Sequence, residues 1–403
     1  MASVMSLVDR APAPIRRLVY RVASGAGLLG RLVEAVRFRP GGASGPALPR
    51  DDGAAVKLFI GPANSAGQGY EWARAVERTY SDTSAVALYG IGVNPFQQSA
   101  DLTVPPAVHR RSAAWHQALE AYLIGRTHVV WESGLPLLGR LHGADVIREM
   151  EALSAHGVAG ALLFHGSDIR PPRAHADVEP WSPFRGAPGA TVALEAEAAR
   201  HRQLVARSCA PVFVSTPDLM RWLPDATWCP VVVDSERWHP REERDTASAP
   251  PVVVHAPSNG WLKGTSSVRP ILRRLDDEGL ITYREITAVP HEQMPDFYSR
   301  ADIVLDQFVL GIYGVAACEA MASGCVVMSH VDDFTRREVR IRTGRELPVV
   351  ETTAETLEDE LRRFAADPAE YGAVRDAGVS FVRAVHDGRR AAAALAGFLG
   401  LKE

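Results

Sequence analysis

The sequence predicts an α/β protein in which two mostly parallel sheets are each covered by helices on both faces. Short apolar strands alternate with amphipathic helices from about residue 54 onward, and the alternation stops in a charged, proline-flanked stretch at 234–249 before it begins again. A length of 403 residues is also too great for one hydrophobic core and fits two or three domains. We therefore expect two Rossmann-like domains that face each other across a cleft.

The composition excludes several functional classes. Hydrophobic residues make up 46% and charged residues 23% of the chain, so the chain as a whole is neither disordered nor fibrous. A formal net charge of -4 lacks the basic excess of a dedicated nucleic-acid binder. No apolar run reaches the roughly 18 residues of a membrane-spanning helix. We expect a soluble, cytoplasmic enzyme.

The cysteines show no C-x-x-C spacing, which argues against both a disulfide framework and a zinc site. We expect all of them to be buried thiols in a reducing compartment: Cys209, Cys229, Cys318 and Cys325.

Residues 1–50 differ from the remainder and are expected to form a helical extension that ends in a linker. Within Met1–Pro40, arginines far outnumber the two acidic residues, Asp9 and Glu34, and apolar residues recur at helical spacing. This pattern fits peripheral contact of 1–40 with an anionic membrane or a partner groove, a helical tail packed on the protein itself, or a transit peptide. A Gly-x-Gly-x-x-Gly match at 25–30 is rejected as a dinucleotide site, because no buried strand precedes it.

The first domain is expected at 51–238. It opens with the apolar strand Val56–Ile60, a glycine-rich turn at 61–69 and a helix that begins near Tyr70. The elements that follow show the same alternation: strands Ser84–Tyr89, His128–Trp131, Gly160–Phe164 and Pro211–Ser215, and helices Arg111–Gly125, Asp145–His156 and Leu194–Ser208. The stretch Pro171–Ala187 fits either a loop over the cleft or a plain surface excursion.

The second domain is expected at 239–385, followed by a C-terminal helix at 386–403 that packs back toward the first domain. Its elements alternate in the same way: strands Val252–His255, Thr282–Ile286, Asp302–Leu305 and Cys325–Ser329, and helices Ser266–Glu278, Glu292–Ser299, one containing Glu319–Met321, Ala354–Asp367, Tyr371–Val385 and Arg389–Leu399. In open α/β sheets, ligands bind beyond the carboxyl ends of the strands, so the cleft is the expected site.

The loop His255–Thr265 places a lysine between a strand and a helix. Unpaired N–H groups and a partial positive charge make a helix N-terminus a binding site for phosphates, to which Lys263 would add a point charge. Taken alone, the loop fits equally well a solvated lysine followed by ordinary N-caps at Thr265 and Ser266.

A second stretch, 302–327, combines a strand end, two glycines and a helical glutamate. Gly311 and Gly314 permit a ligand to approach the backbone closely. Glu319 lies among small and apolar residues, which favours burial with a specific partner. A carboxylate in such a place can accept hydrogen bonds from both hydroxyls of a ribose.

Lys263-Gly264 and Glu319-Ala-Met-Ala-x-Gly324 together resemble the donor half of the GT-B glycosyltransferases, specifically glycosyltransferase family 4. The resemblance covers roughly residues 54–399 and also includes segments 164–168, 214–224, 231–240 and 289–302. It implies the GT-B architecture and transfer of a sugar, with retention of configuration, from a nucleotide-sugar to an unidentified acceptor. The nucleotide-sugar is a substrate, so no cofactor is expected.

The resemblance also implies which residues form the site. His165 and Lys263 are implied as catalytic. The residues implied to bind the donor are Gly67, Gly69, Ser258, Lys263, Thr265, Val289, Tyr313, Gly314, Val315 and Glu319. No metal is expected, since the sequence contains no Asp-x-Asp, no His-Glu-x-x-His and no cysteine–histidine cluster.

Two departures from the family pattern keep other functions open. The first glutamate of the Glu-x7-Glu pattern, which contacts the donor sugar in the family, is replaced by Gly311. The arginine that commonly precedes the Lys-Gly pair is also missing, and residues 258–260 stand in its place. The alternatives are a non-catalytic GT-B protein that binds a nucleotide or a partner, and a nucleotide-sugar epimerase of similar fold.

Overall fold

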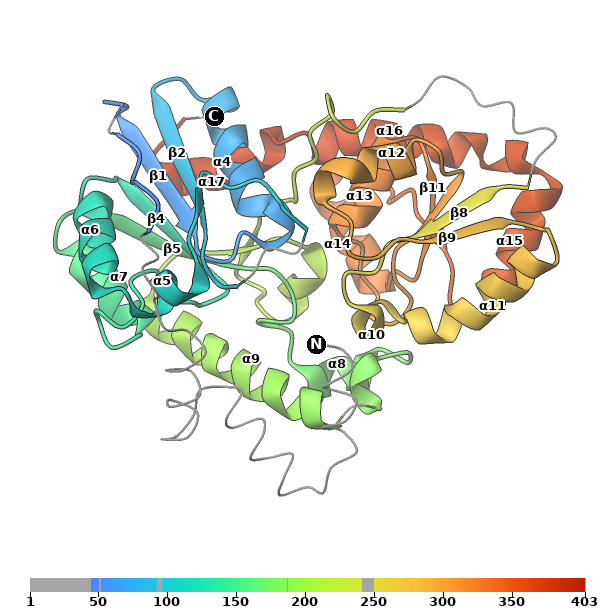
Figure 1. The fold of residues 1–403 in the computed structure, drawn as a ribbon, viewed down its shortest axis with the longest axis horizontal. Coiled ribbons are helices and arrows are strands. Elements are labelled where there is room, and N and C mark those ends of the chain that lie inside the picture. The colour runs from blue at the N-terminus through green and yellow to red at the C-terminus, as the bar shows by residue number, and fades with distance from the viewer. Residues whose placement is uncertain (1–44, 51, 93–95, 187, 241–249, 403) are drawn as a thin grey trace.

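The computed structural model describes residues 45–402 except 51, 93–95, 187 and 241–249. The predicted helical extension and residues 40–44 of the linker predicted at 40–49 therefore lie outside the described residues. The described chain forms two α/β domains side by side, each built around one sheet (Figure 1).

The N-terminal domain contains a seven-stranded sheet in the order β3-β2-β1-β4-β5-β6-β7, and every neighbouring pair is parallel. The strands are β1 (Val56–Gly61), β2 (Thr83–Tyr89), β3 (Leu102–Thr103), β4 (His128–Glu132), β5 (Ala159–Phe164), β6 (Val212–Val214) and β7 (Thr227–Trp228). The helices are α4 (Gln68–Thr79), α5 (Pro106–Arg111), α6 (Ala113–Ile124), α7 (Val146–Ser154), α8 (Pro172–Val178) and α9 (Pro188–Ser208), with short 3-10 turns at η1 (Ser65–Gly67), η2 (Pro183–Arg185) and η3 (Pro217–Arg221).

The C-terminal domain contains a five-stranded, fully parallel sheet in the order β12-β11-β10-β8-β9. The strands are β8 (Val252–His255), β9 (Thr282–Glu285), β10 (Ile303–Leu305), β11 (Val326–Ser329) and β12 (Val350–Glu351). The helices are α10 (Gly260–Lys263), α11 (Thr265–Asp277), α12 (Met294–Tyr298), α13 (Val315–Ala322), α14 (Asp333–Thr343), α15 (Leu357–Ala366) and α16 (Gly372–Val385), with 3-10 turns at η4 (His291–Gln293) and η5 (Pro368–Tyr371). The last helix, α17 (Arg389–Leu399), packs on the N-terminal domain. The predicted α/β class with two parallel sheets is confirmed.

Burial of both sheet faces explains why the strands are continuous apolar runs. In β1, Leu58 and Ile60 pack into one hydrophobic cluster with Trp72 of α4, whereas Phe59 points into another cluster with Leu119 of α6. Alternate side chains of one strand thus reach helices on opposite faces of the sheet.

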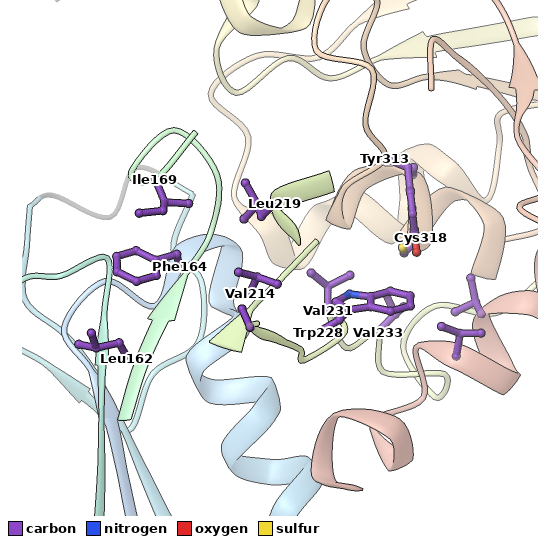
Figure 2. Packing of buried hydrophobic residues seen from close by; sticks show 14 of the residues in the cluster. Leu162, Phe164, Ile169, Val214, Leu219, Trp228, Val231, Val233, Tyr313 and Cys318 are labelled. Carbon is purple, nitrogen blue, oxygen red and sulfur yellow. The ribbon is translucent and has the colours of Figure 1, made fainter. Parts of the chain in front are cut away.

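The two domains share a hydrophobic core instead of meeting only through polar surfaces. One cluster runs from Phe164 of β5 through Trp228 and Val231 to Tyr313 and Cys318 in the C-terminal domain (Figure 2). After α16, the chain crosses back, and α17 packs against α4 of the N-terminal domain (Figure 1).

A second connection is made by the segment 172–185, which comprises α8 and η2. The His175 ring lies 3.2 Å (Nε2 to O) from the carbonyl of Leu310, and the Phe184 and Trp261 rings lie 5.7 Å apart edge-to-face. This segment of the first domain therefore reaches across to the loop after β10 and to α10, as Figure 1 shows for α8 and α10.

Some predicted elements differ from those observed. The predicted helix Arg111–Gly125 is interrupted at Ser112, which leaves helical geometry (φ -83, ψ 94) and caps α6 by accepting a hydrogen bond from Trp115 N–H at 3.3 Å.

Cys209 is exposed, so the expectation of four buried thiols was wrong for this residue, although all four cysteines are free. Within the described residues, no helix is both long and apolar enough to span a membrane.

Candidate functional site

A cavity of about 260 Å³ lies between the domains, at the carboxyl ends of β8 and β9. Residues of both domains line it, including Ala66, Phe96 and Gln98 of the N-terminal domain. Five of the residues implied to bind the donor also line it: Ser258, Lys263, Val289, Val315 and Glu319. The expected ammonium and carboxylate groups thus share one cavity.

Lys263 is the last residue of α10, a single helical turn. Asn259 caps this turn, since its Oδ1 accepts hydrogen bonds from the N–H groups of Trp261 and Leu262. The next residue, Gly264, has φ +73, and a Cβ there would lie 2.7 Å from Val309 Cγ1, so only glycine fits this turn. The local sequence therefore fixes where the lysine leaves the backbone.

The Lys263 ammonium forms an ion pair with Asp306, the residue that follows β10. The lysine side chain is 20% exposed and the Asp306 side chain 1%. The second carboxylate oxygen of Asp306, Oδ2, is buried and has no hydrogen-bond partner among the described residues. The Lys263 ammonium therefore brings a positive charge to the cavity, but Asp306 already pairs with it. A bound phosphate must compete with this carboxylate for the ammonium.

Glu319 lies in α13, whose first turn also contributes Val315 and Ala316 to the cavity wall. The partial positive charge of a helix N-terminus therefore lies at the cavity. The Glu319 side chain is 7% exposed, and its Oε1 lies 2.6 Å from Nε2 of His291. His291 also lines the cavity and is a site residue that the sequence analysis missed. Its position in the segment 289–302, which matched the family, was the available signal.

Other residues implied to bind the donor lie outside this cavity. Thr265 is buried, and its hydroxyl lies 2.8 Å from Nε2 of His255. Tyr313 is also buried, with its hydroxyl 3.3 Å from Nε2 of His386. Burial raises the pKa of the Tyr313 phenol well above its ordinary value. Both side chains support the fold around the site and do not line the cavity.

The glycines implied by the resemblance occupy three different settings. Gly67 borders a much smaller cavity, of about 10 Å³, which shares Ala66, His291 and Glu319 with the main one. Gly69 lies within α4, where an added Cβ would approach the carboxylate of Glu132 to 3.4 Å. Gly314 is the N-cap of α13 but does not line the main cavity.

His165 follows β5 and belongs to a buried polar network. Its Nε2 lies 2.9 Å from Oε1 of Glu132, a fully buried carboxylate, and its ring stacks on Trp72 with centroids 5.6 Å apart. Although burial disfavours the charged ring, the hydrogen bond and charge of Glu132 raise the pKa of His165. Asp168 caps the turn by accepting the N–H groups of His165 and Gly166. His165 lines neither of the two cavities described above.

A carboxylate of the N-terminal domain fills the space beside Gly311. This glycine has φ +66, and a Cβ on it would lie 2.7 Å from Oε2 of Glu179. The same Oε2 lies 3.0 Å from Nε2 of His330, whose Nδ1 lies 2.6 Å from Oε1 of Glu351. Burial alone would lower the pKa of His330, but hydrogen bonds to the two glutamates raise it to about 9. The position expected to contact the donor sugar therefore lies against an interdomain bridge, Glu179–His330–Glu351.

Among the described residues, no group of three or more histidine, cysteine, aspartate or glutamate side chains is arranged to hold a metal ion.

Comparisons with known proteins agree with this architecture. A family model described as glycosyl transferase-like matches residues 244–397. Sucrose-phosphate synthase from Thermosynechococcus elongatus superposes with a TM-score of 0.54 at 14% identity, covering 85% of this chain and 97% of that one. Anabaena HepE in complex with UDP and glucose gives 0.53 at 12% identity, covering 85% and 99%.

A glycosyltransferase from Rickettsia africae ESF-5 gives a TM-score of 0.51 at 10% identity, covering 84% of this chain and 96% of that one. No curated protein sequence matches the chain. The protein thus has the GT-B fold of two facing α/β domains, and its residues 244–397 match a glycosyl transferase-like domain.

Proposed function

We propose that the protein is a glycosyltransferase, similar to family 4, that transfers a hexosyl group from a nucleotide-sugar donor to an acceptor. The observation that carries this proposal is the shared cavity, in which Lys263, Glu319 and the first turn of α13 meet at the carboxyl end of the C-terminal sheet. Anabaena HepE, a structural neighbour, was solved with UDP and with UDP-glucose, which makes a uridine nucleotide the first donor to test.

The proposed mechanism stabilises charge on the leaving nucleoside diphosphate. The Lys263 ammonium and the N–H groups at the start of α13 would bind the phosphate oxygens, and Glu319 would accept hydrogen bonds from the ribose hydroxyls. These groups would supply the charge stabilisation that a metal ion provides in other enzymes, which supports a metal-independent reaction. We propose retention of configuration on the resemblance to family 4 alone. His165 lines neither cavity, so its proposed role in orienting the sugar requires the sugar to extend from the nucleotide toward the end of β5, where Glu132 and Trp72 hold the imidazole ring in one position.

Two observations favour the second candidate, a non-catalytic GT-B protein that binds a nucleotide and scaffolds other proteins. Asp306 already occupies the Lys263 ammonium, and Glu179 occupies the space beside Gly311. The first feature leaves less positive charge for the donor phosphates, and the second fills the position that contacts the donor sugar in the family.

Binding and turnover distinguish the two candidates. Calorimetric titration with UDP, GDP, ADP, CDP and TDP tests the cavity, and failure of all five to bind contradicts both candidates. Hydrolysis or transfer from the corresponding nucleotide-sugars then tests catalysis. Turnover that Lys263→Ala and Glu319→Ala both reduce supports the transferase, whereas binding without turnover supports the scaffold. Turnover that neither substitution changes would contradict the proposed site.

The basic segment 1–40 motivates a further proposal on location. Its arginine-rich amphipathic pattern supports weak binding to anionic bilayers from the cytoplasm and, with it, a lipid-linked acceptor. This segment lies outside the described residues, so the proposal rests on the sequence alone.

A further inference from the structure

Within the described residues, the carboxylate of Glu319 has a side-chain hydrogen-bond partner in His291. Its Nε2 lies 2.6 Å from Oε1, and both side chains line the main cavity. A nearly buried carboxylate needs hydrogen-bond donors to stay charged and in one orientation. Because a carboxylate has about four acceptor positions, one imidazole donor leaves the others for a ligand.

The main chain of His291 is held from outside the C-terminal domain. Its N–H donates to the carbonyl of Phe96, in the N-terminal domain, at 2.7 Å. Its carbonyl accepts from Nη2 of Arg237, in the segment that joins the domains, at 2.6 Å. The Trp238 ring packs beside its imidazole, with centroids 5.6 Å apart. Residues of the other domain and of the connection thus fix where the imidazole points.

We propose that His291 is a positioning residue that orients Glu319 toward the ribose and makes nucleotide affinity depend on the contacts between the domains. This inference rests on the proposed function, because it takes the ribose diol as the partner of Glu319. The cavity binds a nucleotide with full affinity only when Phe96 and Arg237 hold His291 in place. Loss of those contacts releases the imidazole and frees the carboxylate to rotate.

The first experiment compares a nucleotide that has the ribose diol with one that lacks it. UDP, or the diphosphate that the panel above selects, is titrated calorimetrically beside its 2′,3′-dideoxy counterpart. We expect His291→Ala to weaken binding of the ribonucleotide about tenfold, the loss typical of a hydrogen bond to a charged group. Neither His291→Ala nor Glu319→Ala should change the affinity for the dideoxy nucleotide. His291→Gln, which retains an N–H donor at a similar reach, should recover most of the affinity.

The matched control is His142→Ala. His142 forms the same kind of pair with Glu120, with its side chain 24% exposed, but lines neither cavity. It should not change affinity for either nucleotide. If His291→Ala unfolds the protein, His291→Asn, whose amide does not reach as far, takes its place. An equal loss for both nucleotides, no loss for either, or no recovery in His291→Gln overturns the proposal. If the unmodified protein binds no nucleoside diphosphate, the proposed function itself fails.

A second experiment tests the tie to the other domain. Arg237→Ala removes the donor to the His291 carbonyl and should weaken ribonucleotide binding several-fold. In the double variant with His291→Ala, the two losses should not add, because both act through the same imidazole. Fully additive losses would show that the interdomain contacts do not act through His291.

Discussion

The ion pair between Lys263 and Asp306 leads to a quantitative prediction about phosphate binding. Lys263→Met keeps most of the length of the side chain and removes its charge. A hydrogen bond between charged groups contributes about 1.5–3 kcal/mol. Since the phosphate must share the ammonium with Asp306, we expect the lower end of this range, a loss of about tenfold in UDP affinity. Uridine, which has no phosphate, should bind equally to both proteins.

The reverse substitution sharpens the test. Asp306→Asn removes the competing charge, so UDP affinity should rise several-fold and the rise should vanish in the double variant with Lys263→Met. Calorimetric titrations at one fixed ionic strength measure these effects, because salt screens such charges. Lys402→Met, at an exposed position near the C-terminus, is the matched control. Unchanged UDP affinity in Lys263→Met, or an equal loss for uridine, would refute a phosphate role for Lys263.

Three further predictions concern the interdomain bridge and the N-terminal extension. The pKa of His330 is about 9, against 6.5 for an ordinary histidine, so its bridge should stabilise the fold below pH 6.5 and lose this contribution as pH rises through 9. Because the Glu351 side chain is 45% exposed and solvent screens its charge, we expect a contribution of about 1–2 kcal/mol. Thermal unfolding of His330→Gln should lack this alkaline decline, and an identical decline in both proteins would exclude the bridge as its source. Gly311→Ala should lower the melting temperature more than Gly344→Ala. Both glycines have positive φ (+66 and +69), but only at Gly311 would the added Cβ meet neighbours, Glu179 Oε2 at 2.7 Å and Asp332 Cβ at 3.0 Å. Equal shifts would contradict this close packing. The full chain should sediment with anionic vesicles more than a chain that begins at Asp51, and equal pelleting rejects membrane contact.

The parallel strands could be predicted because burial on both faces requires apolar runs, as in Val252–His255. Lys263 and Glu319 could be predicted because each lies in a short family motif, Lys263-Gly264 and Glu319-Ala-Met-Ala-x-Gly324. The two-residue strands β3 and β7 are too short to produce a periodic signal.

The partners of the site residues could not be predicted, because they depend on contacts between distant segments. His291 and Glu319 are 28 positions apart, and Glu179 and His330 are 151. No local pattern indicates that a loop of the first domain supplies a carboxylate beside Gly311. The same holds for Tyr313, whose small and apolar neighbours gave no sign that its side chain turns into the core toward His386.

The return of α17 to the N-terminal domain has a consequence for dissecting the molecule. Its inward face, formed by Ala391, Leu395 and Leu399, is covered by Trp72 and Val76 of α4. A C-terminal fragment cut between the domains, within 234–249, would expose this apolar face of α17 to water. The N-terminal fragment would expose the matching apolar face of α4. The halves are therefore poor candidates for separate expression, and a split that respects the architecture would keep the last helix with the first sheet.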